Sequence, residues 1–219
     1  MFNVNTGSRM LDNFLDSVDV FSSDDEIVEQ PDFHVKVSIS TDRLFAETTV
    51  VAARPSSITF SYLFDSDEGI PIICNATKAV IGRVVLFRGI AFVSVNRQQT
   101  RFNVSDIVET SRIIVLHSQQ SRSNSIIMFT SSSLSPGNRP IPTFGGLAAD
   151  QYTQCLIRGL ECTVIINEHT SIQADLDGIM SQWHALSKLV PEIADYSEDR
   201  VKQEFKRVFP INKKVPLYT

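Results

Sequence analysis

The sequence predicts an α/β fold, a single three-layer αβα domain with a mixed sheet and a strand-rich first half. From residue 33 apolar and polar residues alternate with the period of a strand. In the second half, continuous apolar runs alternate with helical segments, and two amphipathic helices close the chain. A chain of 219 residues, 42% of them hydrophobic, is long enough to remove about 70% of its unfolded surface from water.

The N-terminal segment is acidic. Residues 1–32 contain eight acidic residues and one basic residue, which gives this segment a net charge of −7. The whole chain has a net charge of −5, so residues 33–219 carry +2. Apolar residues at helical spacing predict one short amphipathic helix here: Met10, Phe14, Leu15 and Val18. Because apolar residues are sparse, we expect residues 1–31 to be a flexible segment, separate from a core domain of residues 32–210.

Short runs with strand character fill the first half, with turn residues between several of them. We expect these strands to be mainly antiparallel. They comprise residues 33–39, 44–52, 57–63, 70–74, 80–87 and 90–95.

In the second half, residues 106–112 predict a short helix. Three continuous apolar runs are typical of strands that are covered on both faces: residues 113–116, 126–129 and 162–166. Residues 147–157 predict a helix after a loop rich in Ser, Pro and Gly. Strands that alternate with helices indicate a sheet between helical layers.

Two amphipathic helices follow. The first includes residues 176–186 and ends near Pro191, with acidic residues in its opening turns. The second has Ser197 as N-cap and ends at Pro210, which cannot continue a helix. We expect it to bury a stripe of apolar residues: Val201, Phe205, Val208 and Phe209.

Composition excludes several classes of protein. The chain has three cysteines, an odd number, and they lack C-x-x-C spacing. This pattern indicates reduced, buried thiols in a cytoplasmic or nuclear protein, at Cys74, Cys155 and Cys162. The start has no signal-peptide pattern and no apolar run approaches 18 residues, so we expect no membrane association. The nearly neutral body lacks the basic face that nucleic-acid binding requires.

The sequence contains none of the common catalytic or nucleotide-binding motifs, and its four histidines are too dispersed to predict a metal site or a cofactor. The strongest enzymatic candidate combines His117 and Ser118, which follow one apolar run, with the Ser131, Ser132 and Ser133 loop, which follows the next. Ligands of open α/β sheets lie outside the carboxyl ends of the strands. A small-molecule enzyme of phosphorylase or hydrolase type is therefore the alternative to our preferred interpretation, polar loops that cap buried strands.

The last residues, 211–219, are too short to form another element, and Pro216 favours an extended backbone. We expect them to project as a docking tail. Leu217 provides an apolar anchor, Tyr218 a ring with a polar tip, and Thr219 a terminal carboxylate that a cation or backbone N–H groups can bind. Lys213 and Lys214 add charge that attracts an acidic protein surface.

The second half resembles a known family. The order of buried strand, Ser-rich loop, helix, buried strand, Trp-containing helix and final helix is similar to the first subunit of the heterodimeric eukaryotic proteasome assembly chaperone. Residues 175–183 and 196–199 are similar to the fungal members, and the Leu-Tyr-Thr end matches a hydrophobic-Tyr-any terminus. The resemblance covers residues 106–219, and more faintly the strands of residues 33–95.

The resemblance implies a non-catalytic function in assembly of the proteasome core particle. With a related second subunit, such a chaperone holds the α subunits, inserts its tail into an inter-subunit pocket of the α-ring, and covers the ring face until the particle matures. The partner-binding residues on this view are Leu217, Tyr218 and Thr219, supported by Lys213 and Lys214.

Overall fold

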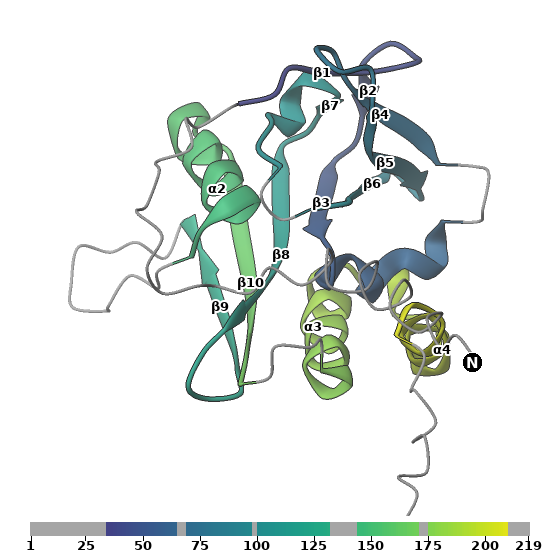
Figure 1. The fold of residues 1–219 in the computed structure, drawn as a ribbon, viewed down its shortest axis with the longest axis vertical. Helices are drawn as coiled ribbons and strands as arrows, with labels where there is room; N and C mark the ends of the chain where they lie inside the picture. Colours follow the sequence, from purple (N-terminus) through teal and green to yellow (C-terminus); the bar gives the residue numbers. More distant parts are fainter. Residues whose placement is uncertain (1–33, 65–68, 98–99, 132–143, 171–174, 210–219) are drawn as a thin grey trace, which may run out of the picture. The chain divides into compact units, whose positions relative to one another are not determined.

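The computed structural model describes residues 34–64, 69–97, 100–131, 144–170 and 175–209 (Figure 1). The chain divides into two units, residues 1–32 and residues 33–219, and every described residue belongs to the second. The helix expected around Met10 to Val18 and the acidic linker lie outside the described residues.

The described part is built on an eight-stranded sheet with the order β1-β4-β5-β6-β3-β8-β10-β9. β6, β3, β8 and β10 run parallel to one another, whereas β1, β4, β5 and β6 pair antiparallel and β9 pairs antiparallel with β10. The predicted mixed sheet is thus confirmed. The strands are β1 (Val37–Ile39), β3 (Thr48–Ala53), β4 (Ile70–Cys74), β5 (Val80–Phe87), β6 (Ile90–Val95), β8 (Arg112–Gln120), β9 (Ser125–Thr130) and β10 (Glu161–His169).

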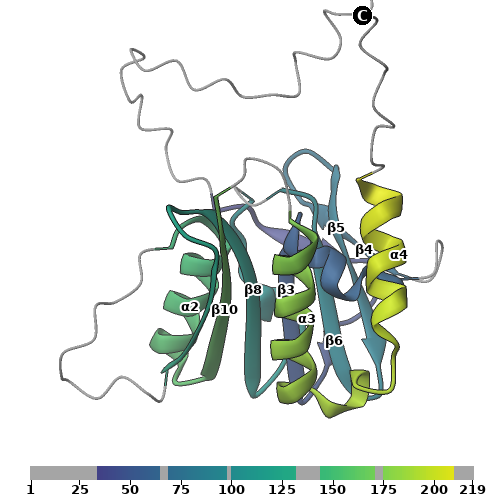
Figure 2. The ribbon, with the colours of Figure 1, turned by 90° about the horizontal axis from the view of Figure 1, so that it is seen from below.

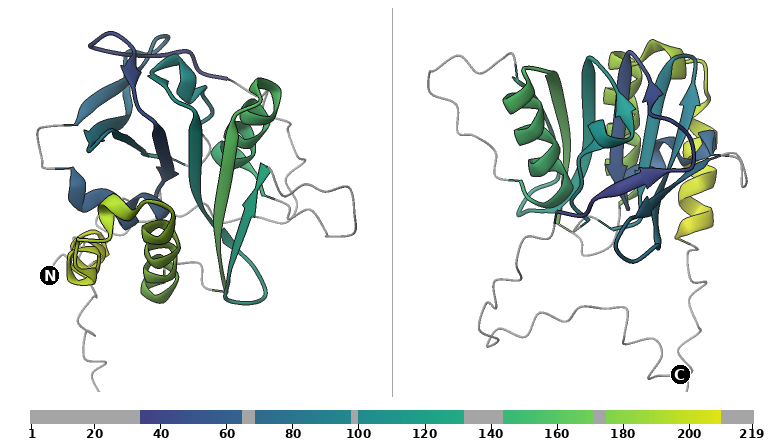
Figure 3. Two further views of the ribbon diagram at one scale, coloured as in Figure 1. Left: turned by 180° about the vertical axis from the view of Figure 1, so that it is seen from behind. Right: turned by 90° about the horizontal axis from the view of Figure 1, so that it is seen from above.

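Helices cover both faces of this sheet, as the sequence predicts for an αβα fold (Figure 2). On one face α3 (Leu176–Leu189) and the 3-10 helix η1 (Ser56–Leu63) pack against the strands, and α4 (Glu198–Val208) packs on η1 and α3. Figure 3 shows α3 and α4 side by side on that face. On the other face lie α2 (Gly146–Arg158), the 3-10 helix η2 (Val104–Asp106) and a two-stranded sheet of β2 (Leu44–Phe45) and β7 (Val108–Glu109).

Covered faces explain the continuous apolar runs. Ile113 and Val115 of β8 point into the core beneath α2, and Ile114 and Leu116 point into the core beneath α3. A strand that is buried on both faces has no position for a solvated side chain, so its sequence does not alternate. The third core joins α3, α4 and η1.

One expectation for the first half is wrong. Residues 57–63 form not a strand but η1, whose residues Ser56 to Phe60 are all buried because the helix is enclosed by the sheet, α3 and α4. Pro55 precedes it, and its fixed φ suits a turn of helix. The expected antiparallel pairing is confirmed for β1, β4, β5 and β6, whereas β3 is parallel to both of its neighbours.

Three expectations for the second half also need correction. Residues 106–112 are not a helix, because Asp106 ends η2, residues 108–109 form β7, and Arg112 begins β8. Residues 126–129 do form a strand, but it lies at the edge of the sheet and Met128 is 55% exposed. Phe209 is 37% exposed rather than buried, because it caps the end of α4.

The prediction that the cysteines are buried and unpaired is confirmed. Cys74, Cys155 and Cys162 are free thiols and all are buried. Cys155 of α2 and Cys162 of β10 belong to the same core, where their side chains hydrogen-bond to each other.

Candidate functional site

Polar side chains gather at the carboxyl ends of the central parallel strands, the position where α/β sheets commonly bind ligands. Ser56, just beyond β3, and Ser118 of β8 are buried, and their hydroxyl oxygens are 2.7 Å apart. They lie on the face covered by η1. Ser56 therefore holds η1 to the sheet through Ser118, which gives this contact a structural role.

His117 is buried on β8, with 9% of its surface exposed. Burial is the main cause that lowers its pKa, from 6.5 to about 4, although a hydrogen bond with the Gln119 side chain opposes the shift. The imidazole is therefore neutral at pH 7. Side chains alternate along a strand, so His117 and Ser118 point to opposite faces of the sheet and do not form a pair.

Ser131 lies at the other end of the sheet. Its hydroxyl accepts a hydrogen bond from the backbone N–H of Cys162 at 3.0 Å, near the start of β10, whereas His117 is level with Ile166. Four residues along a strand span about 13 Å. His117 and Ser131 therefore do not form one site, because β9 runs antiparallel to β10 and its carboxyl end lies opposite to that of β8. Ser132 and Ser133 of the same predicted site lie outside the described residues.

The remaining polar groups at this edge fasten α3 to the sheet. The Gln182 amide donates to the backbone carbonyls of His117 at 2.8 Å and Ile165 at 3.3 Å. Gly178, on the same helix, faces the buried amide of Asn167 on β10, where a Cβ would be 2.7 Å from the amide carbon. Sequence reasoning missed this contact. A glycine inside an amphipathic helix is the signal that could have found it, since it is costly without a packing reason.

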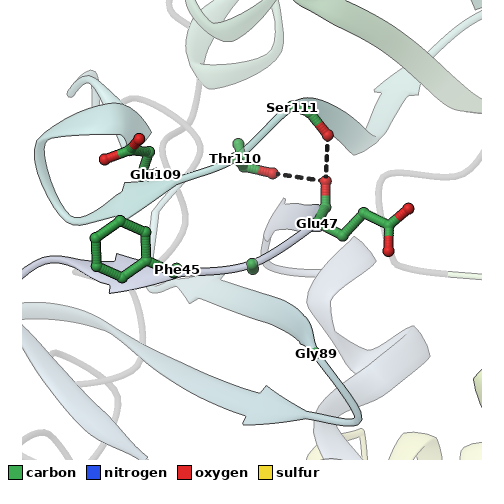
Figure 4. A pocket seen from close by; sticks show the side chains of 7 residues that line it. Phe45, Glu47, Gly89, Glu109, Thr110 and Ser111 are labelled. Atoms are coloured by element: carbon green, nitrogen blue, oxygen red, sulfur yellow. Dashed lines mark hydrogen bonds between the residues drawn. The ribbon is translucent and has the colours of Figure 1, made fainter.

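A hollow of about 550 Å³ lies at the amino ends of β3 and β8 (Figure 4). Phe45, Glu47 and Glu109 line it, and the hydroxyls of Thr110 and Ser111 donate to the carbonyl of Glu47 at 3.1 and 2.9 Å. Both hydroxyls therefore stabilise the backbone at this position. The part of the chain that the structure describes contains no group of His, Cys, Asp and Glu side chains that could hold a metal ion.

α4 is the last described element before the predicted docking tail in the sequence. Val201 and Phe205 pack against Ile58 of η1 and Trp183 of α3, which fixes the helix on the domain. At its start, Glu198 pairs with His184 of α3 at 2.9 Å and with Lys202 at 3.3 Å, and these contacts lower the pKa of the Glu198 carboxyl.

The last turn of α4 presents the exposed cations Lys206 and Arg207. Arg207 also pairs with Glu204, at 2.7 Å. The predicted partner-binding residues lie beyond this turn and outside the described residues: Lys213, Lys214, Leu217, Tyr218 and Thr219. No helix among the described residues is long and apolar enough to cross a membrane.

Solved structures with a similar fold include archaeal proteins related to the proteasome. No family model matches the chain, and no curated protein is similar to it in sequence. Two similar solved structures are from Pyrococcus furiosus. PbaA, an archaeal homolog of proteasome-assembly chaperone, is 10% identical with a TM-score of 0.56, over 78% of this chain and 88% of that one. PbaB, an archaeal proteasome activator, is 9% identical with a TM-score of 0.57, over 83% and 98%.

A Thermoplasma acidophilum protein of unknown function is 12% identical with a TM-score of 0.50, over 80% of this chain and 88% of that one. At such identities the likeness concerns the fold alone. The expected α/β fold class is therefore confirmed, and the chain has the fold of archaeal homologues of the proteasome assembly chaperone.

Proposed function

We propose that the chain is a non-catalytic chaperone for assembly of the proteasome core particle. It acts in the cytoplasm or nucleus, binds the α-ring, and inserts Leu217, Tyr218 and Thr219 into a pocket between α subunits. The observation that carries this proposal is the fold shared with PbaA, an archaeal homolog of proteasome-assembly chaperone. The Leu-Tyr-Thr tail, found independently in the sequence, supports it.

The polar groups of the described domain also favour a binding function. His117 is neutral at pH 7, Ser56 and Ser118 hydrogen-bond to each other, and Gln182 donates to the sheet backbone. The Ser56–Ser118 contact and the Gln182 amide hold helices to strands. A binding protein needs a rigid body of this kind, because a rigid body lowers the conformational entropy lost on docking.

α4 is the part of this rigid body that directly precedes the tail in the sequence. Its buried side, Val201 and Phe205, fixes it on α3 and η1, and its last turn presents Lys206 and Arg207. With Lys213 and Lys214 these cations form a basic region next to the Leu-Tyr-Thr segment. Such a region accelerates association with an acidic protein surface and orients the tail on it.

A related second subunit completes the proposed chaperone. Permanent heterodimers of this kind commonly bury about 2,000 Å² or more of surface. We propose that this partner shares the αβα fold and that the pair, rather than one chain, covers the face of the α-ring.

Deletion of Leu217, Tyr218 and Thr219 tests the function. Removal of one buried anchor side chain weakens binding by about 2 kcal/mol, which is about thirtyfold in affinity. We therefore expect the deletion to weaken the binding of α subunits by at least that factor. The measurement is co-purification of proteasome α subunits with the N-terminally tagged chain, quantified by mass spectrometry. Addition of one residue after Thr219 should weaken capture as well, because it displaces the carboxylate.

Lys188→Ala is the matched control, since Lys188 is an exposed residue of α3. We expect it to leave capture unchanged. Undiminished capture of α subunits by the truncated chain, with its thermal stability intact, contradicts the proposed role of the tail. Capture of no α subunit by the unmodified chain contradicts the proposed function itself.

A further inference from the structure

Two of the chain's three cysteines face each other where α2 packs along β10 (Figure 2). Cys155 follows Tyr152 on the buried stripe of α2. Cys162 is on the side of β10 that points to α2, in the same core as Val164. The period of the helix and the period of the strand thus bring the two thiols together, and their side chains hydrogen-bond to each other.

The backbone on both sides of this contact is held in place. After the last turn of α2, Gly159 adopts a left-handed conformation, with φ 67°, and turns the chain toward β10. The N–H of Leu160 donates to the carbonyl of Cys155 at 2.9 Å, and the N–H of Cys162 donates to the Ser131 hydroxyl at 3.0 Å. These bonds hold the two cysteines next to each other, as a disulfide requires, because cysteines whose backbones lie far apart cannot be bridged.

A hollow of about 480 Å³ lies against Cys155. The Cys155 side chain is itself buried, and a buried thiol reacts only when a reagent reaches it. A Cβ built on Gly159, in the wall of the hollow, would meet no atom within 4 Å, so the space beside it is open. Leu156 and Ile157 in the last turn of α2 are 47% and 74% exposed, so local opening of this turn uncovers Cys155 without unfolding the sheet.

The contact makes the two thiols unequal. The Cys162 thiol donates to the Cys155 sulfur, and this hydrogen bond lowers the pKa of Cys155; burial opposes the shift, and the charge of Arg158 adds to it. The same hydrogen bond raises the pKa of Cys162, and burial raises it further. Because the thiolate is the nucleophile, Cys155 is the cysteine that attacks first.

We propose that Cys155 and Cys162 are a redox modification site and form a reversible disulfide when the folded chain meets a peroxide. The Cys155 thiolate attacks one oxygen of hydrogen peroxide and the O–O bond breaks. The hydroxide that leaves takes up the proton that Cys155 released, which gives water and a sulfenic acid on Cys155.

The second step closes the disulfide. The Cys162 sulfur attacks the sulfenic sulfur, the S–S bond forms and the S–O bond breaks. The hydroxide that leaves takes the proton of Cys162 and becomes a second water. The two thiols together lose two electrons, and the peroxide gains them. A thiol reductant reverses the reaction by thiol–disulfide exchange.

Cys74 provides a control within the same chain. It is buried, and hydrogen bonds with Thr77 lower its pKa. It lies on β4, however, which is five strands from β10, or about 24 Å across the sheet. A lowered pKa alone therefore gives Cys74 no partner, and we expect no disulfide between it and the other two cysteines.

Peroxide oxidation of the purified full chain tests the inference. After hydrogen peroxide treatment and alkylation of the remaining thiols, peptide mass spectrometry should find Cys155 joined to Cys162 within one chain. Dithiothreitol should restore both thiols. Cys74→Ser is the matched control and should form the same disulfide at the same rate.

Two further variants test the order of attack. Cys162→Ser keeps a hydroxyl that can donate to Cys155 but removes the second thiol, so Cys155 should stop at the sulfenic acid and be labelled by dimedone. Cys155→Ser should abolish both the disulfide and the labelling at this site. Thermal unfolding of each variant shows whether the domain is still folded.

The inference is overturned if Cys155 and Cys162 stay reduced in the folded chain, or join only in urea that unfolds the domain. Disulfides that include Cys74 as often as Cys162 overturn it too, because contact would then not select the pair. Equally fast labelling of Cys162 in Cys155→Ser contradicts the order of attack. Because the assay contains no proteasome, its failure leaves the proposed function untouched, and failure of α-subunit capture leaves the disulfide untouched.

Discussion

Gly178→Ala probes the closest contact between α3 and the sheet. A Cβ at this position would be 2.7 Å from the amide carbon of Asn167 and nearer still to the amide oxygen and nitrogen. Asn167 is 3% exposed, so its amide has no solvent into which it could rotate. Overpacking of a well-filled core costs about 1–3 kcal/mol, and the higher helix propensity of alanine returns about 1 kcal/mol.

We therefore expect Gly178→Ala to destabilise the domain by up to about 2 kcal/mol. In a domain of this size that loss lowers Tm by up to about 8 °C. Urea unfolding, followed through the fluorescence of Trp183, measures the free energy of unfolding. Lys188→Ala on the same helix is the control, because an exposed substitution changes stability by less than about 0.5 kcal/mol.

A double-mutant cycle identifies the cause. In an Asn167→Ala background the amide is gone, so Gly178→Ala should become neutral or stabilise by up to about 1 kcal/mol through helix propensity. The same loss in both backgrounds would refute the reasoning, because the cost would then not come from the Asn167 contact.

Two further predictions concern the acid stability of the domain and the N-terminal segment. Burial lowers the pKa of His117 from 6.5 to about 4, so the folded state favours the neutral imidazole. As pH falls from 6.5 to 4, the unfolded state therefore gains a proton that the folded state does not. The free energy of unfolding should drop by up to about 3 kcal/mol over this range. Urea unfolding across that range measures the slope, and an equally steep slope in His117→Gln would argue against the assignment. Removal of residues 1–31 should leave Tm unchanged, since the segment is expected to be separate from the core. Strong hydrogen-exchange protection at residues 10–18, or a fall of several degrees in Tm, would contradict it.

The sequence predicts the covered elements best. Residues 113–116 and 162–166 are continuous apolar runs, and they become β8 and β10, which are buried on both faces. The helical spacing of Ile179, Trp183 and Leu186 likewise predicts α3, since these residues point into the cores. The spacing of apolar residues reflects which side chains are buried. An element that buries side chains at regular positions can therefore be predicted from its own sequence.

Elements whose environment depends on distant segments are not predictable in this way. η1 has an apolar sequence that suits a buried strand, but α3 and α4, more than 100 residues later, enclose it as a helix. The parallel pairing of β3 with β6 and β8 is also set by non-local contacts. An apolar run specifies that a segment is buried but does not specify its neighbours.

The same limit explains why His117 and Ser131 resemble one site in the sequence but lie apart in the structure. His117 and Ser131 each follow an apolar run, and in an all-parallel sheet both would lie at one edge. β9 runs antiparallel to β10 and therefore to β8, so the carboxyl ends of β9 and β8 lie at opposite ends of the sheet. The polar residues that remain at the β8 edge, Ser118 and Gln182, hold η1 and α3 to the sheet. Those two helices are the surface on which α4 packs, so polar residues placed where an enzyme would bind its substrate instead fix the helix that precedes the proposed docking tail.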